Sequence, residues 1–320
     1  MPHNLKKVRA KIGKIEKGGE VLKLGQHETR AENSSKNETF AGINDEAQKP
    51  GMVGRTNEDI SIIPIVGLGG LGKTTLAESV LADKKVNVFD SQAWVHVSKV
   101  FDLKKIGSAI LKSINSSINL DNCALQFMQD NLKRELASSI RYLIVLDEFW
   151  EEDAEKLEKL KQMLQHGRKG SRIILTTRNQ SVVAKLSTGV LAHQRKIRPV
   201  PESDQIKLGV LSPDECWEVI KQTAFGSDDD QSGLEEIGRQ IAEKCGGVPL
   251  VANALGQVMS ELRTVEAWEK IKDTKINFGS RYYQDTLERL MLSYYYMKLD
   301  FKMCFTYLAA FPKGFVVDDV

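Results

Sequence analysis

The segment GLGGLGKTT (67–75) has the residue types and spacing of a phosphate-binding loop. Gly67, Gly72, Lys73 and Thr74 satisfy the pattern G-x-x-x-x-G-K-[ST], between an apolar run and a helix-like stretch. Glycines let successive backbone N–H groups point at phosphate oxygens, and the N-terminus of the following helix adds partial positive charge. We expect Lys73 to bridge the β- and γ-phosphates of a nucleotide and the Thr74 hydroxyl to ligate Mg²⁺. The alternative is a glycine-rich turn that matches by accident, and the flanking strand and helix patterns count against it.

The segment YLIVLDEFW (142–150) places two acidic residues at the end of an apolar run. Ligands of open parallel sheets bind at the carboxyl ends of the strands. We expect Asp147 to hold Mg²⁺ through water and Glu148 to polarise an attacking water molecule. Taken alone, such an acidic pair would be assigned to a helix N-cap or a solvated turn. Its occurrence together with the phosphate loop favours the metal site.

Four short apolar runs predict the strands that position these residues. Between them, apolar residues recur at helical spacing over 106–114, 125–136 and 151–165. Strands that alternate with helices in this way indicate βαβ units and a parallel sheet. The fold class is therefore predicted as an α/β P-loop NTPase. The runs are SIIPIV (61–66), QAWVHV (92–97), YLIVL (142–146) and RIILT (172–176).

After about residue 200 the strand patterns stop and helical patterns take over. A capping box runs from Ser212 to Glu215, with Pro213 at the first helical position, and a second box runs from Ser232 to Glu235. Further helices are predicted at 249–262, 265–272 and 284–297. The second half of the chain therefore predicts a small helical domain.

Composition limits the class of protein. The 320 residues are 41% hydrophobic, enough for a substantial core and two or more domains of about 100–200 residues each. The formal charge is only +2, so no global field favours nucleic acid or an anionic membrane, and no stretch approaches the ~18 apolar residues of a membrane span. The four cysteines form no CxxC pair, which favours reduced thiols and an intracellular protein. The five histidines show no ligand spacing, and we expect core or surface roles for them.

The first 51 residues differ in character from the rest. Residues 1–25 carry seven Lys/Arg against two Glu, with a short heptad-like stripe interrupted by glycines, and we interpret them as a frayed helix remnant. Residues 26–51 are polar and aperiodic, which is typical of a linker.

At this point the motifs and their order resemble the NB-ARC nucleotide-binding region of plant intracellular immune receptors of the coiled-coil, leucine-rich-repeat class. The match runs from about residue 52 to the end. Trp150 after the acidic strand motif resembles the coiled-coil class rather than the Toll-type class. Besides GLGGLGKTT and LIVLDEFW, the resemblance rests on FDSQAWVHVSKVFD (89–102), GSRIILTTRN (170–179), LGVLSPDECW (208–217), CGGVPLVANALG (245–256) and CFTYLAAFPKGF (304–315).

The resemblance implies further site residues and an organisation in domains. Arg178 resembles the sensor arginine that reports on the γ-phosphate, and Pro249 resembles the proline that closes over the base. The domains implied are a coiled-coil remnant (1–25), a linker (26–51), a nucleotide-binding domain (52–203), a helical domain (204–282) and a truncated winged-helix domain (283–320). The residues implied to bind ADP or ATP are Val53, Gly54 and Arg55, which pack around adenine and ribose, the loop residues Gly67, Gly69, Gly70, Leu71, Gly72, Lys73, Thr74 and Thr75, and Arg178 and Pro249, with Thr74 and Asp147 for Mg²⁺.

The sequence also departs from the family pattern. Glu148 stands where the family usually has a second Asp, GGVPLV replaces the more usual GLPLA form, and 293–305 lacks the usual Asp-Asp and Leu-Pro pieces. The chain ends at Val320, within what resembles the start of the winged-helix domain, so the Met-His-Asp motif and the leucine-rich repeats are missing. We therefore expect a fragment or truncated product.

The function implied is an ADP/ATP switch of a plant disease resistance protein, with ADP in the resting state, ATP in the active state and slow hydrolysis as a reset. The implied partners of a full-length relative are its coiled-coil and leucine-rich-repeat domains, a pathogen effector or guarded host protein, and further copies of itself on activation. The expected location is cytoplasmic, with membrane or nuclear association on activation, and no nucleic-acid partner is expected. Two alternatives stay open: a turnover ATPase that uses Glu148 as an efficient base, and an inactive or interaction-only fragment.

Overall fold

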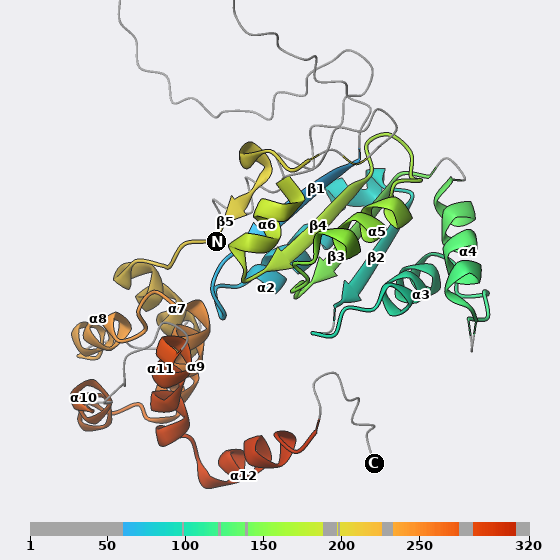
Figure 1. The fold of residues 1–320 in the computed structure, drawn as a ribbon. Helices are drawn as coiled ribbons and strands as arrows, with labels where there is room; N and C mark the ends of the chain where they lie inside the picture. Colours follow the sequence, from blue (N-terminus) through green and yellow to red (C-terminus); the bar gives the residue numbers. More distant parts are fainter. Residues whose placement is uncertain are drawn as a thin grey trace, which may run out of the picture.

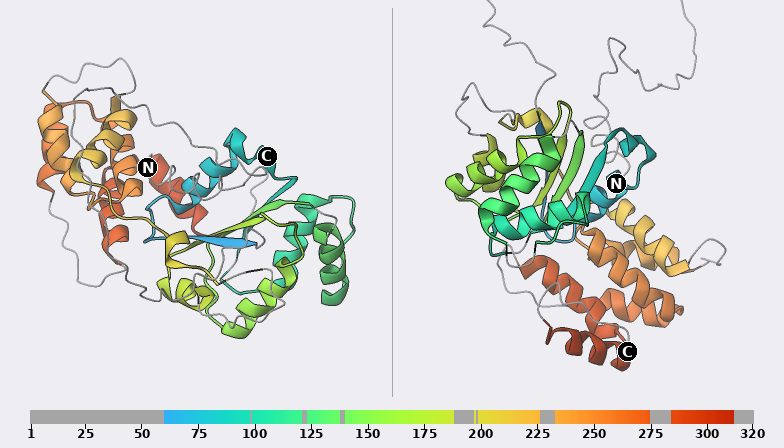
Figure 2. Two further views of the ribbon diagram at one scale, coloured as in Figure 1. Left: turned by 90° about the horizontal axis from the view of Figure 1, so that it is seen from above. Right: turned by 90° about the vertical axis from the view of Figure 1, so that its right-hand side faces the viewer.

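The computed structural model describes residues 60–97, 99–120, 123–137, 140–187, 197, 199–225, 233–274 and 284–311. Within these ranges the chain forms an α/β unit and a helical unit (Figure 1). The helical unit lies beyond the carboxyl ends of the strands and not on either face of the sheet, as the views in Figure 2 also show.

A five-stranded parallel sheet forms the centre of the α/β unit, in the order β2-β3-β4-β1-β5. The four predicted strands are confirmed to within one residue at each end. A fifth strand was not predicted, because a two-residue strand is too short to show any periodicity. The strands are β1 (Ser61–Val66), β2 (Ser91–His96), β3 (Tyr142–Asp147), β4 (Arg172–Thr177) and β5 (Ile206–Lys207).

Apolar side chains of alternate strand residues enter two separate cores, one on each face of the sheet. On one face, α2 (Lys73–Leu81) and the 3₁₀ helix η1 (Lys84–Val88) cover residues such as Ile65 and Val145. On the other face, α3 (Leu103–Ile114), α4 (Leu125–Ala137), α5 (Ala154–Leu164) and α6 (Gln180–Ser187) cover residues such as Ile144 and Ile173. Burial on both faces explains why the strands are continuously apolar.

Strand register brings the chemically important residues to one edge. Val66 at the end of β1 pairs with Thr177 of β4, and His96 at the end of β2 pairs with Asp147 of β3. Because all strands are parallel, the loop after β1 and the acidic end of β3 meet at this edge.

The helical unit contains α7 (Pro213–Phe225), α8 (Glu235–Glu243), α9 (Pro249–Glu261), α10 (Val265–Asp273) and α11 (Gln284–Tyr296). The capping box before α7 is confirmed, since Ser212 N–H bonds Glu215 Oε2 at 2.8 Å and Glu215 N–H bonds Ser212 Oγ at 3.2 Å. Ser232 of the second predicted box lies outside the described residues, and α8 begins after Leu234 at the N-cap. Trp217, Phe225 and Trp268 pack edge to face or tilted in the core of this unit.

A short connection joins the two units. It contains the 3₁₀ helix η2 (Glu202–Asp204) and β5, after which Leu208 N–H bonds Val66 O at 2.7 Å and Leu211 N–H bonds Gly247 O at 2.8 Å. At the other end of the helical unit, α12 (Leu299–Leu308) follows α11 and buries no residue. Within the described ranges no helix has the length and apolar character needed to cross a membrane. The coiled-coil remnant and linker predicted for 1–51 lie outside the described residues.

Candidate functional site

The predicted phosphate loop lies between β1 and α2. Its start is tied to the sheet by a hydrogen bond from Gly67 N–H to Thr177 O of 3.3 Å. Gly70 and Gly72 have φ of 79° and 84°, which side chains with a Cβ rarely adopt, and Gly72 forms the N-cap of α2. Leu71 is buried and anchors the middle of the loop, whereas the Thr75 side chain is exposed. The glycines therefore supply the curvature by which backbone N–H groups surround an anion.

Lys73 is the first residue of α2, and its side chain is only 8% exposed. Its ammonium group donates a 2.8 Å hydrogen bond to Leu68 O within the same loop. Burial and the nearby Arg178 guanidinium lower the pKa of Lys73 to about 8, although Glu148 and Asp147 act in the opposite direction. A lysine in this environment gains strongly from an anionic ligand, which would replace the lost solvation of its charge.

Asp147 and Thr74, the two predicted Mg²⁺ residues, lie in contact. The Thr74 hydroxyl donates to Asp147 Oδ1 at 3.0 Å, and Asp147 is 4% exposed at the end of β3. A hydroxyl and a carboxylate oxygen are the hard donors that Mg²⁺ prefers, with phosphate and water oxygens as the remaining ligands. The donor set therefore fits a magnesium ion bound together with a phosphate.

Thr176 of β4 also contacts Asp147, and sequence reasoning did not single it out. Its fully buried hydroxyl donates to Asp147 Oδ1 at 2.6 Å and accepts from Glu148 N–H at 2.9 Å. One hydroxyl thus fixes both acidic residues. The sequence did contain one signal for this role: Thr176 is a polar residue near the end of the apolar strand β4, which lies beside β3.

His96 was expected to have a core or surface role, but the structure brings it to the site. Its Nδ1 lies 3.6 Å from Asp147 Oδ2, opposite the oxygen that the two threonines contact. The strand register explains this position, since His96 and Asp147 are paired residues of β2 and β3.

Glu148 has a backbone φ of 56°, the only positive value for a non-glycine residue in the described ranges. Such a conformation costs of the order of 1–3 kcal/mol and persists where the surroundings impose it. Here the bond from Glu148 N–H to Thr176 contributes to that constraint. The Glu148 carboxylate lies 3.8 Å from Arg178 Nη2, so the predicted base and the predicted sensor are adjacent.

Arg178 follows β4 and reaches across to the phosphate loop. A Cβ atom added at Gly69 would lie 3.0 Å from Arg178 Nη1 and 3.3 Å from Cζ, so the guanidinium passes close to the loop backbone. Its Cζ is 5.4 Å from the centroid of the Trp150 ring. A guanidinium group therefore lies beside the phosphate loop.

The phosphate loop also contacts the helical unit directly. Leu250 N–H, in the first turn of α9, donates to Gly70 O at 3.2 Å. A Cβ atom at Gly70 would lie 2.9 Å from Val248 Cγ1, which shows how closely the two backbones approach. Pro249, predicted to contact the base, is the first residue of α9 and therefore lies beside this contact.

Comparison with known proteins agrees with this geometry. A family model described as the NB-ARC domain matches residues 52–230, more than half of the chain. The chain belongs to the NB-ARC family. This family has a P-loop NTPase fold and binds nucleotide, usually with Mg²⁺.

The chain is similar to plant disease resistance proteins. The chain is 38% identical to the disease resistance protein RGA2 of Solanum bulbocastanum over 258 residues, which are 80% of this chain and 25% of that protein. It is 32% identical to the putative disease resistance RPP13-like protein 1 of Arabidopsis thaliana over 259 residues, 80% of this chain and 23% of the relative. The chain thus spans about a quarter of the length of these relatives.

Solved structures give a more distant match to the NB-ARC chain. The ORC2 protein of Aeropyrum pernix aligns with a TM-score of 0.48 at 16% identity, covering 69% of this chain and 63% of that one. A STAND protein of Pyrococcus horikoshii with a tetratricopeptide repeat sensor aligns with a TM-score of 0.43 at 16% identity, covering 79% of this chain and 32% of that one.

Most of the predicted NB-ARC site residues converge in the structure. The loop 67–75, the acidic pair Asp147 and Glu148, and Arg178 form one continuous group, and Pro249 reaches it through its neighbour Leu250. Val53, Gly54 and Arg55, predicted to surround the adenosine, lie outside the described residues.

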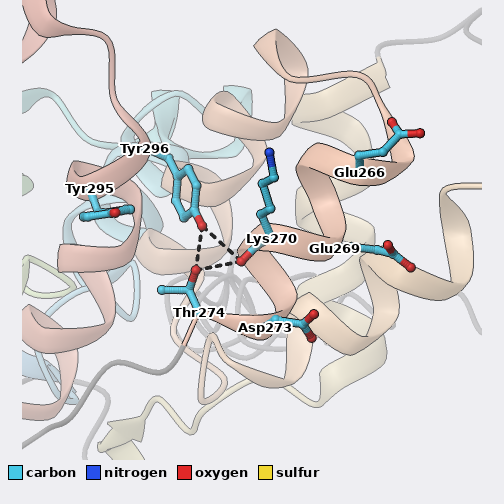
Figure 3. A pocket seen from close by; sticks show the side chains of 7 residues that line it. All are labelled: Glu266, Glu269, Lys270, Asp273, Thr274, Tyr295 and Tyr296. Atoms are coloured by element: carbon cyan, nitrogen blue, oxygen red, sulfur yellow. Dashed lines mark hydrogen bonds between the residues drawn. The ribbon is translucent and has the colours of Figure 1, made fainter.

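A separate open hollow lies between α10 and α11 of the helical unit (Figure 3). Three carboxylates, from Glu266, Glu269 and Asp273, give it an acidic rim. The hydroxyl groups of Tyr296 and Thr274 lie 2.5 Å apart, and Tyr296 Oη donates to Lys270 O at 3.0 Å. None of the predicted site residues lines this hollow.

Proposed function

We propose that this chain binds ADP or ATP with Mg²⁺ as the nucleotide switch of a plant disease resistance protein. The observation that carries the proposal is the 3.0 Å hydrogen bond between Thr74 and Asp147, which joins the end of the phosphate loop to the acidic end of β3. A hydroxyl and a carboxylate held together beside a buried lysine form the minimal set for a phosphate and its magnesium ion.

Each residue has a distinct part in binding. The loop amides surround the β-phosphate, Lys73 neutralises the phosphate charge, and Arg178 contacts the terminal phosphate of ATP. Mg²⁺, when bound, would neutralise part of the phosphate charge. Thr74 and Asp147 would hold this ion, and the Thr176 hydroxyl keeps the Asp147 carboxylate in place.

The switch depends on how the loop contacts the helical unit. Because Gly70 of the loop accepts a hydrogen bond from Leu250 of α9, the loop conformation and the position of α9 depend on one another. A ligand shifts such an equilibrium by its differential affinity for the two arrangements. ADP favours a closed resting arrangement, and the γ-phosphate of ATP adds contacts to Arg178 that favour an open one.

The wider role follows from the relatives. They are disease resistance proteins, and the part that matches this chain is about a quarter of each. We propose that in such a protein the switch acts inside the plant cell, together with coiled-coil and leucine-rich-repeat domains. Recognition of an effector or of a guarded host protein would promote the ATP state, self-association and the hypersensitive response.

We propose a nucleotide-binding domain over 52–203, a helical domain over 204–282 and the start of a winged-helix domain over 283–320. One refinement concerns the first boundary. Because β5 pairs with β1, Ile206 and Lys207 belong with the sheet, and the boundary is best drawn after Lys207.

A turnover ATPase is the second candidate, in which Glu148 activates water efficiently. The adjacency of the Glu148 carboxylate to Arg178 favours slow hydrolysis, because a carboxylate engaged by a guanidinium is not positioned to activate a water molecule. Steady-state hydrolysis separates the two candidates. Ordinary enzymes turn over about ten times per second, and a rate of that order would contradict the switch.

The deciding experiment is to purify the chain without added nucleotide, denature it and identify the released molecules. We expect ADP at about one equivalent per chain. The variant Lys73→Ala should release none, because it removes a charged contact to phosphate. Lys112→Ala, an exposed lysine of α3, is the matched control and should retain ADP. A folded wild-type chain that carries no nucleotide and takes up neither ADP nor ATP in calorimetry would overturn the proposal.

A further inference from the structure

Trp150 lies immediately beyond the acidic end of β3 and collects two cations around its ring. The Arg178 Cζ atom is 5.4 Å from the ring centroid, and the Lys99 ammonium group is 5.9 Å from it. Both separations are within the range of cation–π attraction, which is strongest for tryptophan. The indole therefore gathers positive charge at the edge of the sheet where the phosphate loop lies.

Arg178 is held from three sides. The Trp150 ring centroid lies 5.4 Å from Cζ, the Glu148 carboxylate lies 3.8 Å from Nη2, and a Cβ atom added at Gly69 would lie 3.0 Å from Nη1. The guanidinium also lowers the pKa of Lys73, which agrees with its position close to the loop lysine. An arginine side chain has many rotamers, and these contacts favour those that point toward the loop.

We infer that Trp150 is a positioning residue, which holds the Arg178 guanidinium beside the phosphate loop and so strengthens the binding of ATP relative to that of ADP. The inference rests on the proposed function. Its physical basis is preorganisation, since an arginine already placed beside the terminal phosphate loses little conformational freedom when the ligand binds. Lys99 also lies near the Trp150 ring, but it belongs to the segment after β2. Of the two cations, only Arg178 is close to the phosphate loop in the contacts described above.

The test measures the dissociation constants of ADP and of a non-hydrolysable ATP analogue, each with Mg²⁺. For Trp150→Leu we expect the ratio of the ADP constant to the analogue constant to fall about fivefold, as loss of one cation–π contact implies. Trp150→Phe keeps an aromatic face and should retain most of the ratio. Lys99→Gln removes the other cation and should leave the ratio unchanged.

A double variant shows whether Trp150 acts through Arg178. Arg178→Gln should lower the ratio by at least as much as Trp150→Leu, and adding Trp150→Leu to it should have no further effect. Circular dichroism and the melting temperature show whether each variant is folded. If Trp150→Leu does not fold, the single variants Trp150→Phe and Arg178→Gln still test the inference.

Three results would overturn the inference. One is that Trp150→Leu weakens ADP and the analogue equally, which would indicate a structural role only. Another is that Trp150→Leu and Arg178→Gln have additive effects on the ratio of the two dissociation constants in the double variant. The third is that Lys99→Gln changes this ratio as much as Trp150→Leu does. If the wild type binds neither nucleotide, the proposed function itself fails, and that outcome is distinct from these three.

Discussion

Thr176 donates a 2.6 Å hydrogen bond to Asp147 from the neighbouring strand. The same hydroxyl accepts from the N–H group of Glu148, whose backbone has the unusual positive φ. Because Thr176 is fully buried, no water replaces either bond if the hydroxyl is lost. The two acidic residues of the site therefore share one support.

The first prediction concerns this support. Thr176→Val keeps the shape of the side chain, but it removes the hydroxyl partner of the Glu148 N–H group and leaves Asp147 Oδ1 with the Thr74 hydroxyl. We expect the free energy of unfolding to fall by about 1–3 kcal/mol and Mg²⁺-dependent ADP affinity to fall as well. Urea unfolding and titration with and without Mg²⁺ measure the two effects.

Thr176→Ser is the matched control, because it keeps the hydroxyl and removes only a methyl group. It should bind ADP with Mg²⁺ nearly as the wild type does. Equal losses of ADP affinity in the serine and valine variants would show that the methyl group, and not the hydroxyl, matters for the site.

The second prediction follows from the pKa of Lys73, which is lowered to about 8. Phosphate oxygens favour the charged form, so this pKa rises when nucleotide binds. Above pH 8 binding must therefore take up a proton, and ADP affinity should fall by up to about tenfold per pH unit. The last ionisation of a phosphate group has a pKa of about 6. It is therefore nearly complete at pH 7.5 and does not obscure the change in ADP affinity between pH 7.5 and 9.5.

Stability of the nucleotide-free chain should change in the opposite direction. The ordinary pKa of lysine is 10.5, so between pH 8 and 10.5 the unfolded chain holds the Lys73 proton more often than the folded chain does. Stability contributed by this group therefore rises with pH across that window. Lys73→Met removes the group, and the difference in melting temperature between wild type and Lys73→Met isolates it. Affinity that stays flat from pH 7.5 to 9.5 would contradict the assignment.

The third prediction concerns the contact between the phosphate loop and α9. Gly70→Ala places a methyl group 2.9 Å from Val248 Cγ1 and 3.1 Å from Leu250 Cβ, at a position with φ of 79°. We expect it to weaken both ADP binding and the packing of α9 on the loop. Gly233→Ala is a matched control, since Gly233 has φ of 81° but no atom of the described residues within 4 Å of an added Cβ.

The control variant bears only the backbone strain, about 1–2 kcal/mol. Gly70→Ala should cost at least about 1 kcal/mol more in urea unfolding, because the added methyl group crowds the contact. If the two variants lose the same stability and both retain ADP, the loop and α9 are not coupled through Gly70.

The fourth prediction reverses a common expectation about helices. Gly238 lies within α8, where glycine-to-alanine changes usually stabilise by up to about 1 kcal/mol. Here the added Cβ would overlap the buried ring of Trp217, which is rigid and packed among aromatic neighbours. Gly238→Ala should therefore destabilise the helical unit by about 1–3 kcal/mol.

Gly107→Ala in α3 gives a comparison within the same chain. Its Cβ would meet the end of the Met128 side chain, which is flexible and able to move aside. We expect a smaller loss of stability than for Gly238→Ala, as measured by urea unfolding. A stabilised Gly238→Ala variant would contradict the described packing of α8 against Trp217.

Sequence patterns predicted the elements of this fold well because its signals are local. Continuous apolar runs gave the strands, and the Ser212–Glu215 box and Pro249 marked helix starts that the structure shows at α7 and α9. The phosphate loop and the acidic strand end were recognisable because their chemistry demands particular residues at fixed spacing.

Contacts between distant segments were not predictable in this way. The roles of Thr176 and His96 depend on which strands are neighbours and on their register, and a single sequence reveals neither. The short strand β5 is defined by its pairing with β1, since its two residues carry no pattern of their own. The hydrogen bond from Leu250 N–H to Gly70 O likewise depends on how the helical unit packs against the α/β unit.

The hydrogen bonds that flank the connection between the units limit how the helical unit can turn. Leu208 N–H is hydrogen-bonded to Val66 O of β1, and Leu211 N–H is hydrogen-bonded to Gly247 O. Gly209 and Val210 lie between these two bonds. Gly209 has open space around it, and Val210 is exposed. A rotation of the helical unit away from the sheet would therefore take place about four backbone torsions, the φ and ψ angles of Gly209 and Val210. A proline in place of Val210 would remove one of those torsions and stiffen the joint.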